Sequence, residues 1–234
     1  MKQRSFLTAE WRSLLMINYE IDPQILDPYV PAGIEPDTWN GKSYVSMVGF
    51  LFCHTKVLNL PVPFHRNFEE VNLRFYVRRK AEGKTRRGVV FIKEIVPRRA
   101  IAFVARTLYG ENYVALPMKH DMNGDTLLYE WRFAKRRHHM SARASGEYSL
   151  PAPGSEEEFI AEHYWGYSAQ KGRGCVEYRV EHPPWRVRRA EQPHLDCDVP
   201  LMYGAEFKPA LSSKPTSAFI AEGSPVTVYQ GIRI

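Results

Sequence analysis

The stretch FEEVNLRFYVRR, residues 68–79, decides the fold class of this chain. Apolar and polar side chains alternate along it, which is the period of a β-strand and not of a helix. Its apolar face carries Val71, Leu73, Phe75 and Val77, and its polar face carries Glu70, Asn72, Arg74 and Tyr76. The stretch therefore predicts a half-buried strand. Its polar stripe must face either solvent, which composition favours, or the interior of a barrel.

Further strands lie on both sides of this one in the sequence. The turn at residues 82–85 joins it to an apolar strand at 88–96, so that the two are expected to form a long hairpin. Asn40-Gly41 is a strong hairpin signal in front of another strand at 44–57. Shorter strands are predicted at 14–21, 127–133, 175–180, 217–221 and 226–234.

Three short helices interrupt the strands. Asp22 can cap a helix that begins at the following proline, and Ser155 with Glu158 forms a capping box. Apolar residues at helical spacing within 101–108 predict the longest helix, with Gly110 as its stop signal. Many strands and few helices predict a mainly β fold, a large antiparallel β-barrel, as one domain over residues 1–234. A barrel too wide to be filled by side chains encloses a ligand cavity.

The composition bounds the compartment and the partners. Three cysteines at scattered positions fit free thiols, which predicts a cytoplasmic protein. No apolar run approaches the roughly 20 residues that cross a bilayer, so we expect no membrane partner. The net charge of +6 comes from clusters of arginine and lysine. We place these clusters at solvated strand ends, and we do not expect a nucleic-acid site.

The chain lacks the sequence features of common cofactor and metal sites. It has no dinucleotide-binding fingerprint, no phosphate loop and no nucleophile elbow. Residues 194–198 gather potential metal ligands, but no second ligand pair at zinc-site spacing accompanies them, so this segment predicts a turn. His138 and His139 follow basic residues and are expected on the surface. We therefore expect no cofactor and no metal.

Three stretches resemble a known family. They are NYEIDPQILDPYVPAG at 18–33, PVPFHRNFEEVNLRFYV at 61–77 and RRGVVFIKEIVPRRAIAFVARTLYGENY at 86–113. They closely resemble the YqjF-like proteins of the acetoacetate decarboxylase-like superfamily. The resemblance covers roughly the whole chain and implies the large antiparallel β-barrel of that superfamily. It also implies that Glu70, and with it the polar stripe, faces the interior.

The resemblance carries over only part of the decarboxylase machinery. Decarboxylases have a glutamate near a strand aromatic, then a segment Arg-Glu-x-Trp-Gly-Phe-Pro-Lys-Lys whose first lysine forms a Schiff base. Phe68-Glu69-Glu70 resembles the first element, which puts the acid or base role on Glu70. Met118 stands in place of the first lysine, and the superfamily's first-strand arginine falls near Asn18. The second element is matched by Arg106, Tyr109, Gly110, Pro117 and Lys119.

The leading prediction is therefore a β-barrel that binds a small organic acid in an internal cavity, with enzymatic activity left open. Its lining would be Glu70, Asn72, Arg74, Arg106, Tyr109 and Tyr113. One alternative is a lyase with Lys119 as Schiff-base nucleophile and Glu70 as acid or base. Against it, Asp121 near Lys119 favours the charged amine, which cannot attack a carbonyl. The other alternative is a non-catalytic binder of nucleic acid or another polyanion, and the oligomeric state, monomer or homo-oligomer, stays open.

Overall fold

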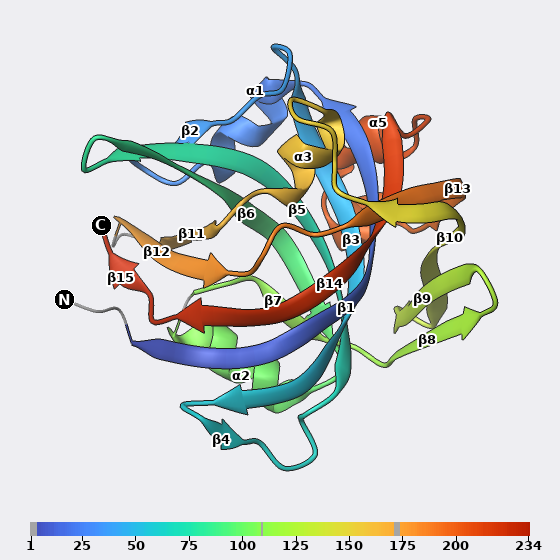
Figure 1. The fold of residues 1–234 in the computed structure, drawn as a ribbon, viewed down its shortest axis with the longest axis horizontal. Helices are drawn as coiled ribbons and strands as arrows, with labels where there is room; N and C mark the ends of the chain where they lie inside the picture. The colour runs from blue at the N-terminus through green and yellow to red at the C-terminus, as the bar shows by residue number, and fades with distance from the viewer. Residues whose placement is uncertain (1–3, 109, 171–173) are drawn as a thin grey trace.

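A closed ring of strands forms the body of the protein (Figure 1). The computed structural model describes residues 4–108, 110–170 and 174–234. A second pairing, between β12 and β14, closes the sheet on itself. In order around the ring the strands are β1 (Ser5–Ile21), β14 (Ser217–Tyr229), β12 (Gly174–Glu181), β11 (Trp165–Gln170), β6 (Lys84–Val96), β5 (Phe68–Ala81) and β3 (Ser43–Val57).

The first half of β14 also starts a second, open branch of the sheet. Its strands are β13 (Val187–Asp196), β10 (Arg136–Ser149), β9 (Thr126–Phe133) and β8 (Met118–Asn123). Short strands complete the sheet: β2 (Glu35–Pro36), β4 (Leu60–Pro61), β7 (Tyr113–Ala115) and β15 (Ile232–Arg233). The predicted barrel is confirmed, but its sheet is mixed, because β6 pairs in parallel with both β7 and β11.

The helices are short. They are α1 (Pro23–Leu26), η1 (Asp27–Tyr29), α2 (Arg99–Leu108), α3 (Glu156–Ala161), α4 (Val199–Met202), η2 (Ala205–Phe207) and α5 (Lys208–Leu211). Of these, α2 and α3 pack against the interior side chains of the ring. The predicted caps are confirmed: Asp22 Oδ1 accepts from the Gln24 N–H, and Ser155 Oγ accepts from the Glu158 N–H. Gly110, at φ +69°, follows α2 and donates its N–H to Arg106 O. Among the described residues no helix is long and apolar enough to cross a membrane.

Strand β5 is buried on both faces, which settles the position of its polar stripe. Its apolar face packs outside the ring against β9 and β10 in a core cluster that includes Leu73, Phe75, Tyr129, Trp131 and Met140. Its other face, with Glu70, Asn72 and Arg74, points into the ring and is also buried. The compositional preference for solvent is therefore wrong. The branch formed by β8, β9 and β10 covers the face of β5 that points away from the interior of the ring.

Two predictions for this outer branch are wrong: the turn at residues 194–198 and the exposed position of His138. Residues 118–123, for which no strand was predicted, form strand β8, and the segment 194–198, predicted as a turn, begins on strand β13. His138 is buried, stacks on Trp131 and accepts a hydrogen bond from the Asp198 N–H. These strands alternate polar with small residues and contain no long apolar run, so the pattern resembles a solvated segment. No group of three potential metal ligands occurs within the described ranges.

The parallel seam between β6 and β11 depends on a glycine. Gly88 pairs with Trp165, and a Cβ on residue 88 would lie 2.5 Å from Trp165 O and 2.7 Å from Tyr167 Cε2. Because one of these neighbours is backbone, we expect Gly88→Ala to lower the free energy of unfolding by about 1–3 kcal/mol. Urea denaturation checks this, with the exposed Thr85→Ala on the same strand as the near-neutral control. Equal stability of the two variants would show that the seam is not closely packed.

Candidate functional site

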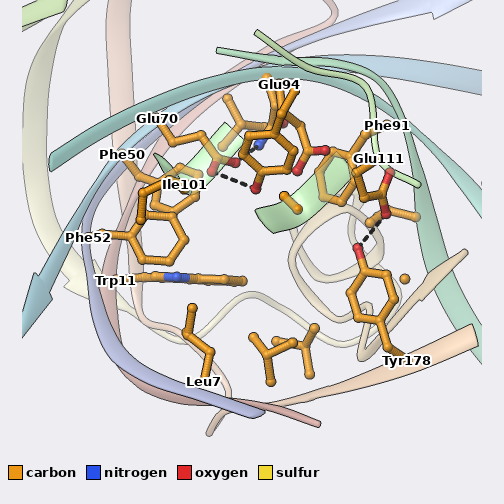
Figure 2. A pocket seen from close by; sticks show the side chains of 18 of the residues that line it. Leu7, Trp11, Phe50, Phe52, Glu70, Phe91, Glu94, Ile101, Glu111 and Tyr178 are labelled. Carbon is orange, nitrogen blue, oxygen red and sulfur yellow. Dashed lines mark hydrogen bonds between the residues drawn. The ribbon is translucent and has the colours of Figure 1, made fainter. Parts of the chain in front are cut away.

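A cavity of about 270 Å³ lies inside the ring (Figure 2). Most of its wall is apolar. Trp11, Phe50, Phe52 and Phe91 line it from strands β1, β3 and β6, and Ile101 lines it from helix α2. A pocket of this kind, mostly apolar with a few convergent polar groups, is the usual form of a small-molecule site.

Three glutamates form what we call the carboxyl cluster: Glu70 on β5, Glu94 on β6 and Glu111 between α2 and β7. All three are buried, and Figure 2 shows them together at one side of the cavity. The sheet brings them there, because Asn72, two residues after Glu70, pairs with Glu94 across β5 and β6. Strand β7, which pairs with β6, then carries Glu111 to the same place.

Amide and phenol groups hold two members of the carboxyl cluster. Asn72 Nδ2 donates to Glu70 Oε1 at 3.0 Å, and Tyr113 Oη donates to Glu70 Oε2 at 3.0 Å. Tyr178 Oη donates to Glu111 Oε1 at 2.8 Å. Glu94 Oε2 is buried and has no hydrogen-bond partner among the described residues.

Burial makes the carboxyl cluster hold protons near neutral pH. It raises the pKa of Glu70 to about 7, and the hydrogen bonds from Asn72 and Tyr113 limit the rise. Burial raises the pKa of Glu111 to about 8. For Glu94, burial and then the charges of Glu111 and Glu70 raise the pKa well above its ordinary value. Buried carboxyls with raised pKa values in a cavity are typical of acid–base sites.

The cavity also holds one permanent positive charge. Arg74 is nine-tenths buried, and its guanidinium carbon lies 5.7 Å from the centre of the Tyr76 ring. Its only oxygen contact among the described residues is a 3.4 Å hydrogen bond from Nη2 to Ile160 O, and no carboxylate lies within 4 Å. Two histidines line the same region, and burial lowers the pKa of both His163 and His182 to about 4. Both are therefore neutral at pH 7.

Polar atoms without partners collect around the cavity. Within the described part of the chain, five cavity-lining residues carry a buried side-chain nitrogen or oxygen with no hydrogen bond. The atoms are Trp11 Nε1, Asn72 Oδ1, Arg74 Nε, Glu94 Oε2 and His163 Nδ1, whereas His163 Nε2 lies 3.6 Å from Asp37 Oδ2. Since buried polar groups are nearly always paired in native proteins, this concentration indicates a site for a polar guest.

The structure brings together some of the residues expected from the sequence and separates others. Glu70, Asn72, Arg74 and Tyr113 all line the cavity. Arg106 does not: it is exposed on α2, where its Nε donates to Ala102 O. Tyr109 lies outside the described residues.

Lys119 also lies outside the cavity. It is on β8, in the open branch of the sheet, where its side chain is 60% exposed and Nζ is 3.6 Å from Glu130 Oε2. This position does not fit the Schiff-base role predicted for Lys119, because its amine is exposed and does not reach the cavity. None of the described residues that line the cavity is a lysine.

Sequence reasoning missed several residues of the site: Glu94, Glu111, His163, Tyr178 and His182. Only Glu94 left a usable signal, because it interrupts an apolar strand on the face that the alternation assigns to the interior. Tyr178 meets Glu111 only after β12 closes the ring, 67 residues further along the chain. Local patterns contain no information about such a contact.

Comparisons with known proteins agree on family and fold. Residues 8–225 match the family DUF2071, described as an uncharacterized conserved protein. The chain is 31% identical over 188 residues to the uncharacterized protein YqjF of Bacillus subtilis (strain 168), which covers 77% of this chain and 74% of that protein.

Solved structures with the same fold include acetoacetate decarboxylase from Legionella pneumophila. It superposes with a TM-score of 0.69 at 13% identity over 99% of this chain and 88% of that one. An acetoacetate decarboxylase-like enzyme from Sphingomonas wittichii RW1 gives 0.66 at 12% identity, over 98% and 93%. The enduracididine biosynthesis enzyme MppR, complexed with pyruvate, gives 0.65 at 12% identity, over 100% and 91%. Identities this low carry the fold alone. The chain therefore belongs to the DUF2071 family, and its fold is that of acetoacetate decarboxylase.

Proposed function

We propose that this protein binds a small organic acid inside the ring of strands, with the ligand's carboxylate paired to Arg74. The observation that carries the proposal is a buried guanidinium that lines the cavity and has no carboxylate within 4 Å among the described residues. An unpaired buried charge costs several kcal/mol. A ligand carboxylate would recover this cost and satisfy the unpartnered Arg74 Nε.

The carboxyl cluster selects the other end of the ligand. Glu94 and Glu111 hold protons near neutral pH, so they can donate a hydrogen bond but would repel a second carboxylate if ionised. We therefore propose that the ligand is a monoacid with a carbonyl or hydroxyl group at its other end, and that its apolar part lies against Trp11, Phe50 and Phe52. The description of MppR as complexed with pyruvate, a small acid of this kind, supports the proposal.

The two alternatives from the sequence have less support. A Schiff-base lyase needs a lysine in the cavity, and Lys119 is outside it. A nucleic-acid site on the hairpin of β5 and β6 or on β10 needs arginines free to contact phosphate, but these clusters are ion-paired. Arg79 and Arg86 contact Glu177, Arg87 contacts Asp37, and Arg136 contacts Asp196.

Thermal shift with matched acids and amides tests the proposal. We expect monocarboxylic acids of about three to eight carbons, with a carbonyl or hydroxyl group, to raise the melting temperature, and the corresponding amides to leave it unchanged. A ligand at about 100 times its dissociation constant adds about 2.7 kcal/mol to the free energy of unfolding. For a chain of this size, that raises the melting temperature by several degrees. Arg74→Met should abolish the shift, and Lys119→Ala should keep it.

Two outcomes would contradict the proposal: amides that stabilise as well as acids, or an Arg74→Met variant that still responds to acid. Methionine keeps most of the volume of the arginine and leaves no buried charge, so this variant is expected to fold. Its melting curve without ligand provides that check.

A further inference from the structure

The cavity opens to the surface beside helix α2. Val104 of α2 lines the cavity and is also 38% exposed. Val57, Val62 and His65, from the segment that contains the β3–β4 hairpin, line the same cavity from the other side. Figure 1 shows α2 and β4 at the same end of the ring, so these two segments form the rim of the opening.

Large apolar side chains point outward from this rim. Phe64 is 90% exposed and Leu60 is 71% exposed, and both flank the cavity-lining Val62. Leu58 at the hairpin tip and Phe103 on α2 are each more than half exposed. Single exposed apolar residues are normal on protein surfaces, but a group around one opening marks an interaction site.

The same two segments are strongly basic. Residues 54–68 and 97–108 contain no aspartate or glutamate. Their exposed cations are Lys56, Arg66, Arg98, Arg99 and Arg106, and within the described ranges none of them forms an ion pair. This contrasts with the paired arginines of the hairpin turn and β10. The rim therefore combines exposed aromatic and aliphatic side chains with five uncompensated positive charges.

We propose that the rim docks on the surface of an anionic lipid bilayer. The phenylalanines and Leu60 would enter the boundary between headgroups and acyl chains, and the cations would contact anionic headgroups, which is how basic amphipathic surfaces bind membranes. A second copy of the chain fits poorly, because it would bring five unpaired cations against five others. Nucleic acid fits less well than a bilayer, because its phosphates leave Leu60 and Leu58 without an apolar partner.

This docking revises the expectation of no membrane partner, which considered only segments long enough to span a bilayer. The inference rests on the rim alone, so it stands whether or not the interior binds an acid. If both hold, the mouth of the cavity faces the bilayer, and a membrane-partitioning acid could enter without crossing water.

Sedimentation with vesicles tests the docking. We expect the full chain to bind vesicles of phosphatidylglycerol and phosphatidylcholine in equal parts and not vesicles of phosphatidylcholine alone. Arg98→Glu with Arg99→Glu should lower the partition coefficient about thirtyfold or more, since each cation near an anionic surface contributes about a factor of five. Leu60→Ser with Phe64→Ser should lower it at least about tenfold.

Matched controls come from other exposed sites. Lys80→Glu with Lys84→Glu changes the same charge at the β5–β6 turn, and Leu201→Ser removes an exposed leucine from α4. Neither should alter vesicle binding. A Phe64→Trp variant should shift its emission to shorter wavelength with the anionic vesicles only.

The inference would be overturned by equal binding of the rim and control variants, by no preference for anionic vesicles, or by a concentration-dependent dimer that Phe64→Ser dissociates. Tighter binding to duplex RNA than to vesicles would also overturn it, in favour of a nucleic-acid surface. Circular dichroism of each variant establishes that the fold is retained, and the substituted side chains are exposed.

Discussion

Glu177→Ala is expected to lower the free energy of unfolding by about 3–5 kcal/mol. Glu177 lies on β12, and its side chain is fully buried on the face opposite the cavity-lining Tyr178. Its carboxylate accepts from Arg79 of β5 at 3.0 Å and from Arg86 of β6 at 2.5 Å. Arg86 also lies over the Trp165 ring, 4.5 Å from its centre. Removing the carboxylate leaves the largely buried Arg79 without an acidic partner among the described residues and leaves Arg86 only its pair with the exposed Glu82.

Urea denaturation measures this effect, with Glu222→Ala as the matched control. Glu222 pairs with Arg186 at 3.9 Å on the surface, with both side chains about half exposed. Surface pairs of this kind contribute less than about 1 kcal/mol. If Glu177→Ala is no more destabilising than Glu222→Ala, the ion cluster that joins β12 to β5 and β6 does not stabilise the ring.

The second large effect is a loss of stability as pH rises, caused by the carboxyl cluster. The ordinary pKa of a glutamate is 4.5, whereas burial raises the pKa of Glu70 to about 7 and that of Glu111 to about 8. Between these values the folded chain binds more protons than the unfolded chain, so stability falls with increasing pH. The contribution is fully present below pH 4.5 and lost as pH passes through 7 and 8. A tenfold difference in proton affinity between the folded and unfolded chain changes the free energy of unfolding by about 1.4 kcal/mol. The free energy of unfolding is therefore expected to fall by several kcal/mol over this range.

Replacing Glu94 isolates this effect. Glu94→Gln keeps the shape of the protonated side chain and removes a group whose pKa burial raises well above its ordinary value, so the stability of the variant should decline less between pH 5 and pH 8.5. The exposed Glu82→Gln should follow the wild-type profile. Denaturation curves across that range give the comparison. The buried His163 and His182, whose pKa is lowered from 6.5 to about 4, act in the opposite direction below pH 6.5. A wild-type stability that rises between pH 7 and pH 8.5 would therefore contradict the protonated state assigned to the carboxyl cluster.

How much of this protein the sequence predicts depends on how local each feature is. The alternation in residues 68–79 was enough for strand β5, and the capping box at Ser155 was enough for α3, because both are set by near neighbours. The polar stripe was also identified from sequence, although composition pointed it outward. Its burial depends on β8 to β10 covering the other face of the sheet, which no local pattern encodes.

The site was harder to predict than the fold. The sequence predicted four of the cavity residues: Glu70, Asn72, Arg74 and Tyr113. The first three lie on one strand with clear alternation, and Tyr113 ends the segment 86–113 that resembles the family. Glu111 and Tyr178 meet across the closed ring, so their pairing follows from topology and not from spacing. Lys119 was placed in the site by its match to a family segment, but it lies on the exposed strand β8, outside the cavity.

A crystal structure of the protein soaked with the acid that most raises its melting temperature tests the central claim most directly. The account predicts a carboxylate within hydrogen-bond distance of the Arg74 guanidinium, with the rest of the ligand extending toward the carboxyl cluster. A ligand bound outside the ring, or one inside it whose carboxylate avoids Arg74, would contradict the account.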